Sequence, residues 1–239
     1  MNSKTQKRFL ILNIFLFVCG IVCLVCYDNF RGLWLKGFTS FWFVLLGGAN
    51  LVYAKKSAVK FSPFAGFVFT GLVFGMCADV LLGVNFILGI VFFASGHLLY
   101  LMAFCRLEKL CLRDVIIIVP IAAASLFVVV GTPYITISDP VLRKMLLGYA
   151  VVIACMLGKA ISNFVAEKTL CRLLIALGSV MFWFSDIMLA IDMFGTPGRL
   201  VWILCSYTYW PAQLILAFSL YHYTNDAANS KHIKAYRRL

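Results

Sequence analysis

The sequence has few charged residues, and especially few acidic ones. Only 13% of its 239 residues are Asp, Glu, Lys or Arg, whereas soluble domains contain about 25%. Hydrophobic residues make up 63% of the chain, and the mean hydropathy is +0.98. A water-soluble fold of this length exposes too much of its surface to hide so much apolar material. The composition therefore excludes a soluble globular protein and predicts a membrane protein.

The sequence also lacks the residue clusters that usually bind metal ions. Of its three histidines, only His97 and His222 lie in apolar segments, one in the middle and one at the end, which argues against a shared zinc site. Its nine cysteines form no paired CxxC motif with histidines at metal spacing. They are interpreted as small packing residues. No metal and no cofactor is expected.

Long apolar runs are abundant, and each approaches or reaches the roughly 20 residues that a helix needs to cross the bilayer. Lipid cannot satisfy open backbone groups and no barrel-like alternation appears, so the runs are predicted to be helices. The expected fold is all-α, a polytopic membrane helical bundle forming one domain over residues 1–239, with a basic cytoplasmic tail over 223–239. The expected spans are residues 9–26, 33–54, 64–82, 86–105, 115–131, 145–164, 173–193 and 200–222.

The distribution of Lys and Arg predicts the orientation. The segments between spans alternate between the two sides of the membrane. Fifteen of the 21 Lys and Arg residues lie in the set of segments that includes both termini, and five lie in the other set. Lys159 lies inside a span. Positive loops stay cytoplasmic, so both termini are predicted to be cytoplasmic, in a bacterial inner membrane or a eukaryotic endoplasmic reticulum membrane. Lys159 is expected to reach toward the headgroups. The net charge of +12 then needs no nucleic-acid partner. The oligomeric state is left open.

Among the ionisable residues inside the predicted spans, two aspartates stand out, Asp79 and Asp186. An intramembrane carboxylate is costly and normally faces a cavity or a partner. Their spans run in the same direction, and the two acids are expected at nearly the same depth. Gly71 and Gly178 each precede the aspartate by eight residues. This similarity suggests a 4+4 parallel internal repeat of a four-helix unit around a central site.

A pair of buried carboxylates has three interpretations. It can be a structural contact between helices, a proton path in a small proton-coupled transporter, or an acid/base pair. In the last case, burial and mutual repulsion favour one protonated acid beside one ionised base. An intramembrane aspartyl protease also uses two helix-borne aspartates, but Met76-Cys77-Ala78-Asp79 lacks its Gly-x-Gly-Asp, and no Tyr precedes Asp186.

Four stretches of the chain resemble the YhhN-like lysoplasmalogenase family. They are residues 71–82, with the first aspartate; 89–104; 178–190, with Ser185-Asp186; and 207–219. The order and spacing of the stretches are similar to those of the family. One departure is Ala78, which stands where the family usually has Gly before the first aspartate.

The resemblance implies that the protein hydrolyses the vinyl ether bond of lysoplasmalogens, giving a fatty aldehyde and a glycerophospho-headgroup. The chemistry of two acids is compatible with this reaction, because one acid can protonate carbon and the other can stabilise the resulting cation and activate water. Asp79 and Asp186 are thus the expected catalytic residues, and the partner is a membrane lipid substrate. Polar residues near them are expected to bind the substrate: His97, Tyr100, Ser185, Tyr209 and Gln213.

The first testable prediction concerns topology. Reporter fusions are expected to place the loops near Lys55 and Arg106 in the cytoplasm, and those near Gly83 and Pro197 on the other side. The reason is the retention of positively charged loops in the cytoplasm. A C-terminal reporter found in the periplasm or the lumen would contradict this topology.

Overall fold

The computed structural model describes residues 3–132 and 135–236, and describes side chains as far as Asn229. The described part of the chain forms eight helices and no strand, which confirms the all-α prediction. The helices are α1 (Ser3–Phe30), α2 (Leu33–Lys56), α3 (Pro63–Leu82), α4 (Phe86–Leu107), α5 (Leu112–Val130), α6 (Pro140–Ala166), α7 (Leu170–Phe194) and α8 (Arg199–Tyr236).

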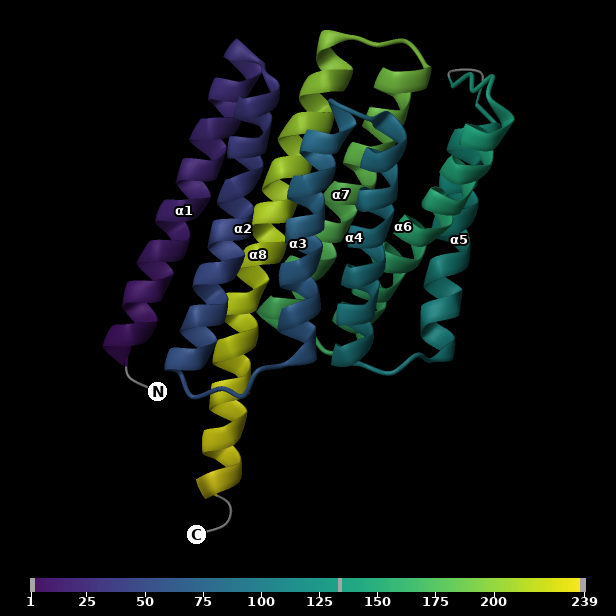
Figure 1. Cartoon of the computed structure of the whole chain (residues 1–239). Helices are drawn as coiled ribbons and strands as arrows, with labels where there is room; N and C mark the ends of the chain where they lie inside the picture. Colours follow the sequence, from purple (N-terminus) through teal and green to yellow (C-terminus); the bar gives the residue numbers. More distant parts are fainter. Residues whose placement is uncertain (1–2, 133–134, 237–239) are drawn as a thin grey trace.

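All eight helices are long and apolar enough to cross a membrane. They run alternately up and down, and both ends of the described chain lie at the same end of the bundle (Figure 1). Each predicted apolar run coincides with one helix, apart from the last residue of the run 115–131, and several helices are longer than their runs. α6, for example, begins at Pro140 rather than Met145, because Asp139 caps it and Pro140 occupies its first turn. The basic side chains from residue 230 onward lie outside the described residues.

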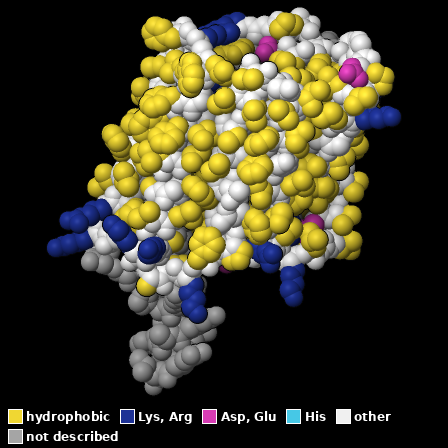
Figure 2. Space-filling model, viewed as in Figure 1, with side chains coloured by type: hydrophobic (Ala, Val, Ile, Leu, Met, Phe, Trp, Pro, Cys, Tyr) yellow, Lys and Arg dark blue, Asp and Glu magenta, His cyan; other side chains and the backbone are white. Residues whose placement is uncertain are grey.

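Apolar side chains cover the outside of the bundle, and many polar side chains face its inside. Figure 2 shows an apolar surface between two ends that carry the charged residues. Inside, Asn13 and Asn50 exchange amide hydrogen bonds between α1 and α2, and Asn50 also donates to the Ala217 carbonyl of α8. This distribution is typical of a helical membrane protein, in which lipid contacts apolar groups and polar groups bond across helices.

Several helix pairs pack in corresponding ways in the two halves of the chain. α3 against α4 and α7 against α8 are the most extensive contacts, α2 packs on α8, and α6 packs on α4. A Cβ on Gly71 would lie 2.6 Å from the Tyr100 ring of α4, and one on Gly178 would lie 3.0 Å from Leu216 of α8. The glycines thus allow close approach at equivalent places. These pairings are compatible with the predicted 4+4 repeat, although α1 packs on α8 whereas its counterpart α5 does not pack on α4 among the described residues.

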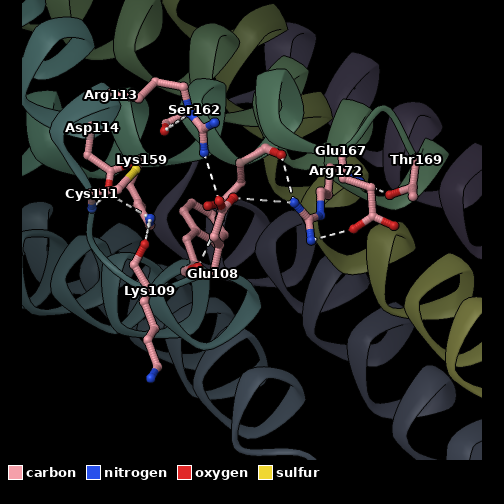
Figure 3. Close-up of polar contacts among 12 residues, drawn as sticks. Glu108, Lys109, Cys111, Arg113, Asp114, Lys159, Ser162, Glu167, Thr169 and Arg172 are labelled. Carbon is pink, nitrogen blue, oxygen red and sulfur yellow. Dashed lines mark hydrogen bonds and ion pairs between the residues drawn. The ribbon is translucent and has the colours of Figure 1, made fainter.

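A buried ionic network joins α5, α6 and α7 near the end that carries the termini (Figure 3). Lys159 is fully buried, and its Nζ lies 2.9 Å from Asp114 Oδ2 and 3.1 Å from the Lys109 carbonyl oxygen. The expectation that Lys159 reaches toward the headgroups was therefore wrong, because a carboxylate on the neighbouring helix offers it a partner inside the bundle. Next to this pair, Glu108 bridges Arg113 and Arg172.

We predict that Lys159→Met lowers the free energy of unfolding by about 3–5 kcal/mol, because it leaves the Asp114 carboxylate buried without its cation. The measurement is denaturant unfolding in detergent. Lys109→Met is the matched control: it removes the same charge from an exposed side chain and keeps the carbonyl that Lys159 contacts. Adding Asp114→Asn to Lys159→Met should recover part of the loss. Equal effects of the two lysine substitutions would contradict the prediction.

Candidate functional site

A polar cavity of about 390 Å³ opens at the end of the bundle opposite the termini. It lies between the α1–α2 turn, the ends of α3 and α7, and the first turns of α2, α4 and α8. Four charged side chains line it: Lys36, Asp79, Asp186 and Asp192. Both aspartates singled out in the sequence thus line one cavity, although α3 ends soon after Asp79 whereas α7 continues to Phe194.

Asp79 is buried and accepts two short hydrogen bonds. The Ser40 hydroxyl of α2 and the Tyr209 hydroxyl of α8 donate to its Oδ2, at 2.5 Å and 2.7 Å. The Lys36 ammonium lies 3.8 Å from its other oxygen, Oδ1. The Trp210 indole donates to the Ser40 oxygen at 3.1 Å and so fixes that hydroxyl. The cation and the two O–H donors stabilise negative charge on Asp79.

Asp186 has different partners, which come from α4 and α6. The Tyr149 hydroxyl donates a short hydrogen bond to Asp186 Oδ2. His97 Nε2 lies 3.3 Å from the same carboxylate oxygen and 2.9 Å from the Tyr149 oxygen. The other ring nitrogen of His97 lies 3.3 Å from the sulfur of Met156. Asp186, Tyr149 and His97 therefore form a compact cluster that holds the Asp186 carboxyl at the cavity wall.

The other predicted binding residues divide between the cavity and the core below it. Tyr209 and Ser185 line the cavity. Beneath Tyr209, the Tyr100 hydroxyl donates to Gln213 Oε1 at 2.6 Å, and Gln213 Nε2 lies 3.5 Å from the Tyr209 oxygen. The absence of a side chain at Gly75 makes this possible, because a Cβ there would lie 2.6 Å from Gln213 Nε2. The chain Tyr100–Gln213–Tyr209 thus supports Asp79 from the core.

His97 does not line the polar cavity in this structure. It is 1% exposed, and its ring packs against Phe182 with ring centroids 4.5 Å apart. Its contact with the site passes through Asp186 and Tyr149. His97 is therefore placed to orient an acid rather than to touch a group bound in the cavity.

Sequence reasoning missed five residues of the site, one of which is Asp192 at the cavity wall. Lys36 was counted only as a loop charge, although it lies in the first turn of α2. Ser40 lies four residues further on, one turn along the same face, so the Lys36–Ser40 spacing was a usable signal. Tyr149 and Trp210 lie in apolar segments among many other aromatic residues, and nothing local distinguishes them.

A second, apolar cavity of about 80 Å³ lies between α4, α5, α6 and α7. Aliphatic and aromatic side chains form most of its wall, among them Val128, Ile135 and Leu146. The two cavities share six lining residues, and Asp186 is the only charged one among them: Leu82, Phe86, Phe93, Asp186, Leu189 and Met193. Asp186 therefore lies at the junction between a polar space and an apolar one.

The residues around the two acids do not form a metal centre. Among the described residues, no group of three or more His, Cys, Asp or Glu side chains is placed to hold a metal ion. What the cavity offers is three carboxyl groups, of which Asp79 and Asp186 have different partners, together with a cation and several hydroxyl groups.

Ala78 next to the first aspartate is fully buried. Its methyl group packs in the core of the bundle. The Ala that stands where the family usually has Gly is therefore accommodated in the helix packing.

Comparison with known proteins gives one match. The model of the YhhN family matches residues 33–220, which include Asp79, Asp186 and the side chains that contact them. Neither the curated proteins nor the solved structures contain a match to this chain.

Proposed function

The chain belongs to the YhhN family, the family of lysoplasmalogenases, and we propose that it hydrolyses the vinyl ether bond of lysoplasmalogens to a fatty aldehyde and a glycerophospho-headgroup. The family is linked to hydrolase activity in general, and the eight apolar helices are those of an integral membrane protein. The substrate, the reaction and the roles of individual residues are the proposal.

The observation that carries the proposal is the junction of the two cavities at Asp186. A lysoplasmalogen has one apolar chain, one polar headgroup and a vinyl ether bond between them. With the carbons next to the vinyl ether in the apolar cavity, the rest of the chain in the bilayer and the headgroup in the polar cavity, the vinyl ether lies beside Asp186. A substrate that is polar throughout or apolar throughout matches only one of the two spaces.

The two acids supply the proton transfers that this hydrolysis requires. Asp186 donates its proton to the vinyl carbon distal to the ether oxygen, which leaves an oxocarbenium ion. Asp79 takes a proton from the water that attacks this cation, and a hemiacetal results. Asp79 then protonates the departing glycerol oxygen while Asp186 takes the hemiacetal proton, so that the aldehyde forms and both acids return to their starting states.

The environments of the acids support this division of roles. Asp79 faces the Lys36 ammonium and accepts two O–H hydrogen bonds, an arrangement suited to the carboxylate that activates water. Asp186 lies at the chain side of the site, where the vinyl ether is placed. After it gives up its proton, the Tyr149 hydroxyl stabilises the resulting carboxylate.

The proposal includes the membrane setting. With both termini cytoplasmic, as the loop charges predict, the polar cavity opens on the opposite side of the membrane. The single-chain lipid is the partner of the protein, and it enters between helices from the bilayer so that its chain remains in an apolar environment.

We predict that Asp79→Asn and Asp186→Asn each lower aldehyde release from lysoplasmalogen by at least ~10²-fold, the lower range for a positioned acid or base. Asn keeps the shape and hydrogen-bonding capacity but removes the titratable proton. The measurement is aldehyde formation by detergent-purified protein. Asp139→Asn is the matched control, since Asp139 caps α6 and lines neither cavity, and Asn is an equally good cap.

A purely structural pair predicts the reverse result, namely lost stability with activity retained in the protein that survives. Proton flux through proteoliposomes that depends on the same two aspartates, without aldehyde release by the unaltered protein, would support a transporter instead.

A further inference from the structure

Lys36 lines the polar cavity but has few partners for its charge. Its side chain is only 20% exposed, and Asp79 Oδ1 at 3.8 Å is the one group within ion-pair distance among the described side chains. No described acceptor lies within hydrogen-bond distance of its Nζ. An ammonium group has three N–H donors, and a half-buried cation normally has acceptors for them.

The charges around Lys36 indicate what it binds. Asp79, Asp186 and Asp192 line the same cavity, and Lys36 is the only Lys, Arg or His side chain among the lining residues that the structure describes. An anionic group entering this cavity meets three acids and one cation. It therefore binds favourably only where the Lys36 ammonium can donate to it.

From this arrangement we infer that Lys36 binds the phosphodiester of the lysophospholipid substrate and determines specificity for a phosphate-bearing headgroup. The inference rests on the proposed function. Lys36 lines the polar cavity and not the apolar one, whereas Asp186 lines both. The order of chain, vinyl ether, glycerol and phosphate along the lipid then matches the order of apolar cavity, Asp186, Asp79 and Lys36.

His97, one of the five residues expected from the sequence to bind the substrate, is not placed to bind the phosphate in the observed arrangement. It is 1% exposed, and its two ring nitrogens are occupied by Met156 on one side and by Tyr149 and Asp186 on the other. The phosphate site is therefore assigned to the first turn of α2 instead of α4.

The competing interpretation is that Lys36 acts only on Asp79, as an electrostatic partner of that carboxylate. The two interpretations predict different effects of losing Lys36 on a vinyl ether substrate that carries the phosphate and on one that lacks it. If Lys36 binds phosphate, its loss raises KM only for the substrate with phosphate, and any loss of turnover through Asp79 is the same for both substrates. If Lys36 acts only on Asp79, turnover of every vinyl ether falls to the same extent.

The test compares 1-alkenyl-glycerophosphoethanolamine with 1-alkenylglycerol, which lacks the phosphate. Lys36→Met is expected to raise KM for the first about tenfold or more, the effect of losing a hydrogen bond to a charged group, and to leave KM for the second unchanged. Lys36→Arg keeps the charge and is expected to retain most of the discrimination. Lys144→Met is the matched control, because Lys144 is exposed at the same end of the bundle and lines neither cavity.

A binding measurement separates this inference from the proposed reaction. The saturated 1-O-alkyl-glycerophosphoethanolamine has no vinyl group and is not cleaved by this chemistry. Lys36→Met is expected to weaken its binding about tenfold, measured by titration calorimetry in detergent, and Lys144→Met to leave it unchanged. This result stands even if the protein releases no aldehyde. Lys36→Gln replaces Lys36→Met if the latter does not elute as a monodisperse species.

Two outcomes would overturn the inference. One is an equal loss of kcat on both substrates with unchanged binding of the saturated analogue, which assigns Lys36 to Asp79 alone. The other is displacement of the analogue by inorganic phosphate but not by glycerophosphoethanolamine, which assigns the ammonium to a free anion instead of a lipid headgroup.

Discussion

Lipid offers no hydrogen-bond partner, and this constraint governs the arrangement of nearly every polar group in the bundle. Asn13 pairs with Asn50, Lys159 with Asp114, and Asp79 with hydroxyl groups from two other helices. Each of these contacts joins different helices, so the polar interior fixes which helices are neighbours. The same constraint explains why the site is formed within the bundle, where polar side chains can surround a cavity that lipid does not reach.

Several helix pairs of the two halves pack in corresponding ways but have different side chains at equivalent places. Gly75 lies four residues after Gly71 and admits the Gln213 amide, whereas Phe182 lies four residues after Gly178 and packs against the His97 ring. The acids consequently have different partners, a cation and hydroxyl groups for Asp79, and a tyrosine and a histidine for Asp186. An acid/base pair needs this chemical difference between its members, and a symmetric pair of environments would not provide it.

The sequence identified the fold class and many of the residues in and around the site from its long apolar runs. A polar residue within such a run costs free energy in lipid, so it normally has a partner or a function. Asp79, Asp186, His97 and Gln213 were found in this way. Lys36 was missed because a lysine near the end of a span is ordinary, and Tyr149 because tyrosines are common in this chain. The error over Lys159 had a related origin, since its carboxylate partner lies on a different helix and 45 residues away.

The sequence by itself determined that the chain forms about eight apolar helices, where each of them lies along the chain, and that two carboxylates lie within them. These properties depend on hydropathy and charge along the chain, which are local. Only the tertiary structure decided that the carboxylates line one cavity, that Lys36 and Tyr149 belong to it, and that Asp186 lies where a polar space meets an apolar one. Those properties depend on which faces of distant helices pack together, and hydropathy does not specify that because every face of a membrane helix can be apolar.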